Sequence, residues 1–281
     1  MGGLVTRYAL AKMEHEGDAD AEEVALYWSY DSPHRGAWIP VAVQAFAHYI
    51  RASDDRFSEY INSAAAQQLL RWHIATSDAK PEISEKRQDF LEELKKVGWW
   101  PQKPRKIGVG NGLGNGQGNG YEPGALALEG KGLNITGTKL KVQSAGNNQL
   151  VAELRVAPRL VKTEVRTSEI FTTMDSAPGG TLDSFGIVAD ALNTLTKNNP
   201  VLALRSEAHI RWHCFVPSVS AVAIRDVDTE DDLYTNIDRL DPSESELDEF
   251  RLVRPEDEEP ENQEHTLMTE ELCSWILERL P

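Results

Sequence analysis

Val24-Ala25-Leu26-Tyr27-Trp28-Ser29-Tyr30 is a short apolar and aromatic run, and Asp31-Ser32-Pro33-His34-Arg35-Gly36 follows it directly. The run has the length and composition of a buried parallel strand, and Asp-Ser-Pro predicts a turn at its end. Helix-forming residues precede the run at 4–12, and a second helix is expected at 40–51. A strand between two helices indicates an α/β fold.

The remaining sequence continues this alternation around a β-rich insertion. Further helices are expected over 57–74, 84–97, 182–195 and 269–280, and strands over 106–109, 133–142, 150–156 and 215–224, with a hairpin turn at 145–148. The glycine- and asparagine-rich tract at 110–120 favours a flexible loop, because glycine loses the most conformational freedom on folding. Three regions result: a core at 1–110, the loop and β-rich insertion at 111–170, and a return to the core at 171–281.

Charge is distributed unevenly along the 281 residues. The segment from Asp226 to Glu271 holds 19 acidic and 3 basic residues, which accounts for the whole formal net charge of −16. Such a run favours a solvated loop and disfavours a nucleic-acid partner, since nothing in it would neutralise phosphates. No apolar run approaches the ~18 residues that suggest a membrane span. No signal peptide is visible, and neither compartment nor oligomeric state follows from the sequence.

Three short segments resemble the lipase and esterase branch of the α/β-hydrolase superfamily. Met1-Gly2-Gly3-Leu4-Val5-Thr6-Arg7-Tyr8 resembles the sequence that follows the nucleophilic serine in lipases, and Ser32-Pro33-His34-Arg35-Gly36 resembles the Thr-Pro-His-x-Gly segment after the next strand. Gln263-Glu264-His265-Thr266 precedes the last helix, where that fold carries its catalytic histidine. The motif G-x-S-x-G itself is absent from the chain. The resemblance therefore implies the C-terminal part of an α/β-hydrolase fold, cut immediately after the nucleophile.

The same resemblance assigns roles to individual residues. His265 is the expected general base, and the backbone amide of Met1 is the expected oxyanion-hole donor. For the acid, the strand after the nucleophile helix ends at Asp31, which is the first candidate, and Asp175 in Thr173-Met174-Asp175-Ser176 is its rival. The segment Cys214–Ala221 resembles the Asp-x-x-Val-Pro-x-x-Ser stretch of lipid acyltransferases, but the Asp is missing, so no acid is transferred from that site.

The expected function is that of a serine ester hydrolase acting on a small-molecule or lipid ester, with this chain inactive without its serine. No cofactor is expected. His209 and His213 are four residues apart, but the strand-like run beside them, 215–224, has no carboxylate, so no metal site is expected either. The alternatives are a non-catalytic α/β protein that binds ligands through the β-rich insertion, a shortened non-catalytic relative of the hydrolases, and an unrelated α/β protein.

Overall fold

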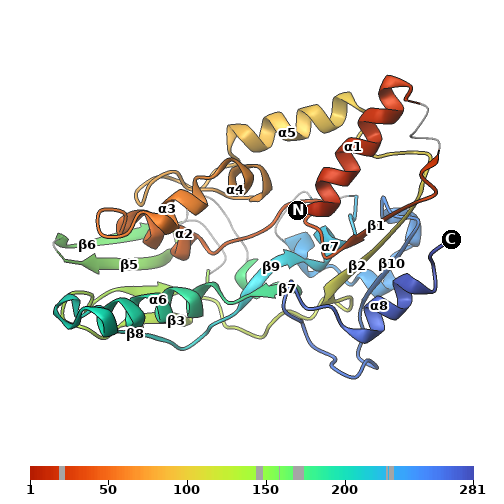
Figure 1. Cartoon of the computed structure of the whole chain (residues 1–281). Helices are drawn as coiled ribbons and strands as arrows, with labels where there is room; N and C mark the ends of the chain where they lie inside the picture. The colour runs from red at the N-terminus through yellow and green to blue at the C-terminus, as the bar shows by residue number, and fades with distance from the viewer. Residues whose placement is uncertain (19–22, 144–147, 158, 167–173, 226, 228–230) are drawn as a thin grey trace.

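The computed structural model describes residues 1–18, 23–143, 148–157, 159–166, 174–225, 227 and 231–281. Two main sheets lie at opposite ends of an elongated molecule, with a two-stranded ladder between them (Figure 1). The mixture of helices and strands expected from the sequence is confirmed, with parallel pairing in one sheet and antiparallel pairing in the other.

The parallel sheet consists of β1 (Leu26–Tyr30), β2 (Arg105–Leu113) and β10 (Glu249–Val253), in the order β1-β2-β10. Helix α1 (Gly2–Glu16) packs on the face that carries Tyr27, whose hydroxyl donates to the Gly3 carbonyl at 2.8 Å. Helix α8 (Glu270–Leu277) lies on the opposite side of the sheet (Figure 1). There, Leu272 and Ile276 contact Val109. Since all three strands are parallel, their carboxyl ends meet at one edge of the sheet.

The antiparallel sheet contains the β-rich insertion and one later strand. Its order is β6-β5-β4-β3-β8, formed by β3 (Leu126–Gly130), β4 (Lys139–Lys141), β5 (Leu150–Val156), β6 (Arg159–Arg166) and β8 (Ser206–Ala208). Helices α2 (Val41–Tyr49) and α6 (Ser184–Asn198) pack against this sheet. Phe46 of α2 and Leu154 of β5 belong to one hydrophobic core, so the insertion is packed on the helices and does not have a core of its own.

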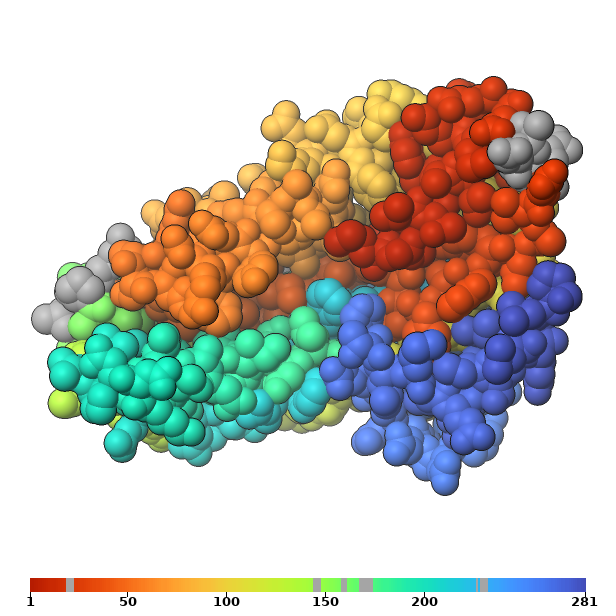
Figure 2. Space-filling view, viewed as in Figure 1, coloured from red at the N-terminus to blue at the C-terminus, as the bar shows by residue number. Residues whose placement is uncertain are grey.

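The remaining elements connect the two sheets. They are α3 (Arg56–Ile61), α4 (Ala64–Leu69), α5 (Glu85–Lys96), α7 (Ser218–Ala221), the 3₁₀ turns η2 (Met174–Ser176), η3 (Pro200–Leu202), η4 (Asp231–Tyr234), η5 (Ile237–Arg239) and η6 (Pro242–Glu244), and the antiparallel pair β7 (Gly179–Leu182) and β9 (His213–Pro217). On the face shown in Figure 2, the N-terminal segment (red) and the C-terminal segment (blue) border one another.

The expectation of a loop from residue 110 onward was wrong for 110–113, because β2 continues through Leu113 and pairs with β10 there. Position 112 requires glycine, because neighbouring atoms occupy the space where a side chain would begin. A Cβ on Gly112 would lie 2.3 Å from the Gly179 Cα and 2.2 Å from the Ser218 Oγ. Because Gly112 has no side chain, β2 can pack directly against the backbone of β7 and against α7.

Several other boundaries also differ from the sequence expectations. The single helix expected over 57–74 is two helices, because Ser63 is extended and caps α4 with its side chain. The strand expected over 215–224 ends at Pro217, and only residues 139–141 of the strand expected over 133–142 pair as β4. The acidic segment includes η4, η5, η6 and β10, so it is not simply a loop. Residues 145–147 of the expected hairpin turn lie outside the described residues.

Candidate active site

Asp31 lies directly after β1, at the carboxyl edge of the parallel sheet. Its backbone N–H donates to the Val109 carbonyl at 2.7 Å, and its φ of 41° places it in the left-handed region. Aspartate is one of the few residues that adopt this conformation readily. The turn buries the carboxyl group completely. A buried charged group must have partners, and those of Asp31 define the site.

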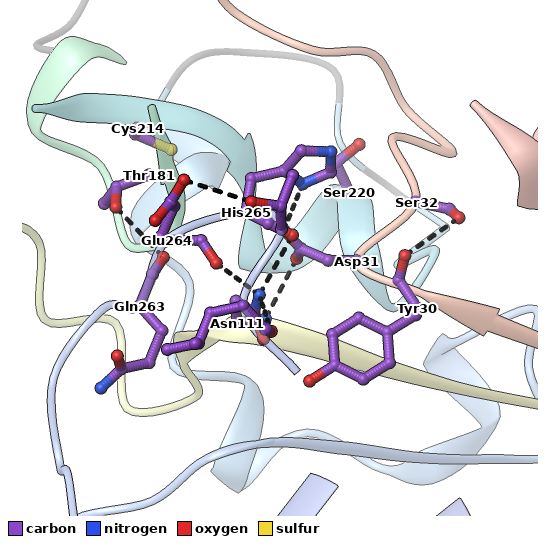
Figure 3. A network of polar contacts seen from close by, with 12 residues as sticks. Tyr30, Asp31, Ser32, Asn111, Thr181, Cys214, Ser220, Gln263, Glu264 and His265 are labelled. Atoms are coloured by element: carbon purple, nitrogen blue, oxygen red, sulfur yellow. Dashed lines mark hydrogen bonds and ion pairs between the residues drawn. The ribbon is translucent and has the colours of Figure 1, made fainter. Parts of the chain in front are cut away.

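The first partner is His265. Its Nδ1 lies 2.7 Å from Asp31 Oδ2 (Figure 3). Its ring packs edge-on against Phe215, with the ring centroids 4.9 Å apart. An ionised carboxylate only accepts hydrogen bonds, so Nδ1 carries the proton and Nε2 is left as an acceptor. The His265 side chain is 20% exposed, and within the described part of the chain Nε2 has no hydrogen-bond partner. Nε2 is therefore available to a substrate or a nucleophile.

Asn111 and Gly180 complete the surroundings of the carboxyl group. The Asn111 N–H donates to Asp31 Oδ1 at 3.0 Å. A Cβ on Gly180 would lie 1.9 Å from Asp31 Oδ2, so β7 approaches the carboxylate at a distance that only glycine allows. Burial raises the pKa of Asp31, and the hydrogen bonds from His265 and Asn111 act against that rise.

The segment that carries His265 is fixed to β7. The His265 N–H donates to the Thr181 carbonyl at 2.8 Å, and the Thr181 N–H donates to the Gln263 carbonyl at 2.8 Å. The segment therefore extends the edge of β7 by a short parallel bridge. This pairing fixes the backbone from which the imidazole reaches Asp31.

Met1 lies at the N-terminal end of α1, close to this pair. Its carbonyl accepts from the Leu4 and Val5 amides, so Met1 caps the helix. Burial lowers the pKa of its α-amino group, and the negative charge of Asp31 acts in the opposite direction. A Cβ on Gly3 would lie 2.3 Å from Ser32 Oγ, which shows how closely the first turn of α1 packs on the turn after β1. The positive end of the helix dipole thus faces the carboxyl edge of the sheet.

Asp175, the rival candidate for the acid, is not brought to His265. It lies in η2, fully buried, where its Oδ2 accepts from the Gln143 N–H at 3.0 Å. Its Oδ1 is buried and has no hydrogen-bond partner among the described residues. Burial raises the pKa of Asp175 to about 7. Of the two candidate acids, the structure therefore pairs only Asp31 with the histidine.

The raised pKa of Asp175 predicts an unusual dependence of stability on pH. The carboxyl ionises near 3.9 in the unfolded chain and near 7 in the folded protein, so its contribution to stability falls as pH rises between these values. Asp175→Asn removes this loss. We expect the free energy of unfolding of the variant, relative to that of the wild type, to rise by about 1–4 kcal/mol from about pH 4 to about pH 8. Urea denaturation at the two pH values measures this difference.

The control for this experiment is Asp190→Asn. Asp190 is exposed, and its pKa is lowered by the hydrogen bond from Arg211. This variant should show no gain toward high pH. Equal stability differences for Asp175→Asn at both pH values would contradict the assignment.

The sequence interpretation missed Asn111, Thr181 and Gly180. All three lie at the carboxyl edge around Asp31, but they come from β2 and β7, far from either member of the pair in sequence. The one available signal was Asn111, a polar residue two positions after Val109, where the strand expected from the sequence ends. Nothing local distinguishes Thr181 or Gly180.

Three other histidines, His34, His209 and His213, have polar partners of their own. His34 Nε2 lies 3.1 Å from Ser29 Oγ, and His213 Nε2 lies 2.7 Å from Ser184 Oγ while its Nδ1 faces the Cys214 carbonyl. Both rings are buried, which lowers their pKa values, that of His213 to about 4. His209 Nδ1 lies 3.6 Å from Glu207 Oε1. In the described ranges, no group of three or more His, Cys, Asp or Glu residues is arranged to hold a metal ion.

Comparison of the chain with protein families, curated proteins and solved structures found no match. Among the described residues, no helix is both long enough and apolar enough to cross a bilayer.

Proposed function

We propose that this chain forms the post-nucleophile part of a serine ester hydrolase of the α/β-hydrolase fold, in which Asp31 and His265 are the acid and base. The observation that carries the proposal is the 2.7 Å contact between His265 Nδ1 and Asp31 Oδ2, which joins residues 234 positions apart. The contact lies at the carboxyl ends of parallel strands, where α/β proteins bind their ligands. A buried acid that orients an accessible imidazole is the acid–base part of a catalytic triad.

The position of α1 supports placing the serine immediately before Met1. In α/β-hydrolases the nucleophile stands between a strand and the helix that follows it. The N-terminal end of α1 lies close enough to Asp31 for the two charges to interact, and the helix packs tightly on the turn after β1. A residue that precedes Met1 would thus stand at the positive end of a helix, beside the Asp31–His265 pair.

The open edge of the parallel sheet is also consistent with this arrangement. In the described part of the chain, β1 pairs with β2 alone, so its other edge is unpaired. A nucleophile strand running into α1 would lie parallel to β1 on this open side and extend the sheet.

The proposed reaction has two steps. The serine Oγ attacks the ester carbonyl while His265 Nε2 takes its proton, and the leaving alcohol then receives that proton from His265. Water attacks the acyl-enzyme with His265 again as base, which releases the acid and restores the serine. Asp31 stabilises the imidazolium in both steps, and the Met1 amide of the longer chain donates to the tetrahedral oxyanion.

The test compares two proteins, the chain alone and the chain extended upstream through its open reading frame. Loss of a triad nucleophile lowers rates by on the order of 10⁶-fold, so the chain alone should give no measurable hydrolysis of a chromogenic acyl ester. The extended protein should hydrolyse the ester and react with a serine-directed phosphonate, and serine-to-alanine replacement should abolish both. Turnover by the chain alone, or an upstream frame without Gly-x-Ser, would overturn the proposal.

One observation favours a second candidate, a binding protein that uses the β-rich insertion. A cavity of about 1000 Å³ lies between the insertion and α6, and its lining includes Lys131, Leu133, Asn193 and Arg205. That volume is within the range that holds small molecules. A ligand held there should bind equally well to a His265→Ala variant, whereas hydrolysis should be abolished by the same change.

A further inference from the structure

Asn111 is the residue that contacts both members of the Asp31–His265 pair. It lies near the end of β2 and is completely buried. Its Nδ2 is 2.7 Å from the Glu264 carbonyl, 3.1 Å from the His265 carbonyl and 2.9 Å from the Leu267 carbonyl (Figure 3). By donating to these carbonyls, the Asn111 amide group holds the backbone on both sides of the histidine.

The backbone of Asn111 completes the arrangement. Its N–H donates to Asp31 Oδ1 at 3.0 Å, and its carbonyl accepts from the Gln263 N–H at 2.7 Å. The acid and the segment bearing the base are therefore both attached to one residue of the central strand. The spacing between carboxylate and imidazole follows from these contacts.

The residue type is explained by the acceptors that it faces. An amide supplies two N–H hydrogens, whereas an ionised carboxylate supplies none. The Asn111 Oδ1 is buried without a hydrogen-bond partner among the described residues, so the side chain is stabilised by its donors alone. An aspartate here would place a negative charge against three carbonyl oxygens.

We propose that Asn111 is a positioning residue that holds His265 in register with Asp31, and that position 111 cannot itself supply the acid. This inference rests on the proposed hydrolase function for its catalytic meaning. The geometric part of it can be measured on the chain as it stands. A shift of about 1 Å in a catalytic group can cost on the order of 10²-fold in rate, so a positioning residue has a measurable effect.

The experiment follows the ring nitrogens of His265 by ¹H–¹⁵N correlation spectroscopy of the labelled chain. In the wild type, neutral His265 should be the Nδ1–H tautomer because Asp31 accepts from Nδ1. In Asn111→Asp and Asn111→Ala we expect a mixture of tautomers. Asn115→Asp is the matched control. The Asn115 side chain accepts a hydrogen bond from the Gln117 N–H through Oδ1, which an aspartate can also accept, so this variant should leave the spectrum unchanged.

His213 serves as an internal control for folding. Its ring is fixed by Ser184 and the Cys214 carbonyl, neither of which contacts Asn111. If His213 keeps its signals while His265 loses its single tautomer, the effect is positional and the proposal is supported. Unchanged His265 signals in Asn111→Ala, or simultaneous loss of both sets in Asn111→Asp and Asn111→Ala, would overturn it.

An exchange of the two side chains tests the second half of the proposal. The double variant Asp31→Asn/Asn111→Asp keeps one acid and one amide at the same strand ends. We expect it not to restore the Nδ1–H tautomer, and restoration would show that position 111 can serve as the acid.

The extended protein separates this inference from the proposed function. There, Asn111→Ala should lower kcat about 10²-fold with little change in KM. If the tautomer responds but the extended wild type has no esterase activity, the positioning role stands and the hydrolase proposal fails. If the wild type is active and Asn111→Ala retains its kcat, the positioning role fails alone.

Discussion

In the proposed serine hydrolase, Asp31→Asn is expected to lower kcat for ester hydrolysis about 10⁴-fold. The buried carboxylate accepts from His265 Nδ1, and this contact selects the tautomer that leaves Nε2 free to take the serine proton. An asparagine can present its amide N–H to the ring instead, which favours the opposite tautomer. It also leaves the imidazolium of the transition state without a negative partner.

The matched control is Asp175→Asn in the same protein. Both aspartates are fully buried, and the sequence left both open as the acid, but only Asp31 contacts the histidine. Asp175→Asn should keep kcat within about threefold of the wild type while changing stability as described above. Equal losses in the two variants, or a greater loss in Asp175→Asn, would remove Asp31 from its assigned role.

Gly112→Ala is expected to destabilise the protein by about 2–5 kcal/mol, or to prevent folding. The added Cβ would lie within 2.6 Å of the Gly179 backbone N as well as close to Gly179 Cα and Ser218 Oγ. Two of these three atoms belong to backbone, and β2 is the central strand, paired on both sides. Neither strand can move without breaking a ladder.

The measurement is urea denaturation followed by circular dichroism, with Gly2→Ala as control. No atom lies within 4 Å of a Cβ built on Gly2, so its stability should stay within about 0.5 kcal/mol of the wild type. If Gly112→Ala matched Gly2→Ala, the close approach of β2 to β7 would be wrong.

Elements with strong local signals could be predicted from the sequence. Ser84 was expected to start a helix, and its side chain caps α5 by accepting from the Arg87 N–H. The apolar run that ends at Tyr30 gave β1 and the turn after it. In contrast, β2 continues through glycines whose local preference is for a loop, because packing against β7 and α7 overrides that preference.

The candidate site could likewise be predicted only in part from the sequence. Asp31 and His265 were named from short motifs, and the structure brings them together. The sequence ranked Asp31 ahead of Asp175 as the acid but left both open, and only the structure shows that Asp31 alone of the two contacts the histidine. Asn111 was missed since its contacts with the His265 segment span more than 150 positions, and no local pattern encodes a contact of that length.

The parallel sheet also has a consequence for the order of folding. Its central strand takes one neighbour from the N-terminal part of the chain and the other from the C-terminal part, so both pairings close long loops. Contacts of high sequence separation form slowly, because the entropy of loop closure must be lost before the pairing is gained. The β5–β6 hairpin and the helices need no such closure. The contact between acid and base, which spans most of the chain, therefore belongs to the slow, long-range part of folding.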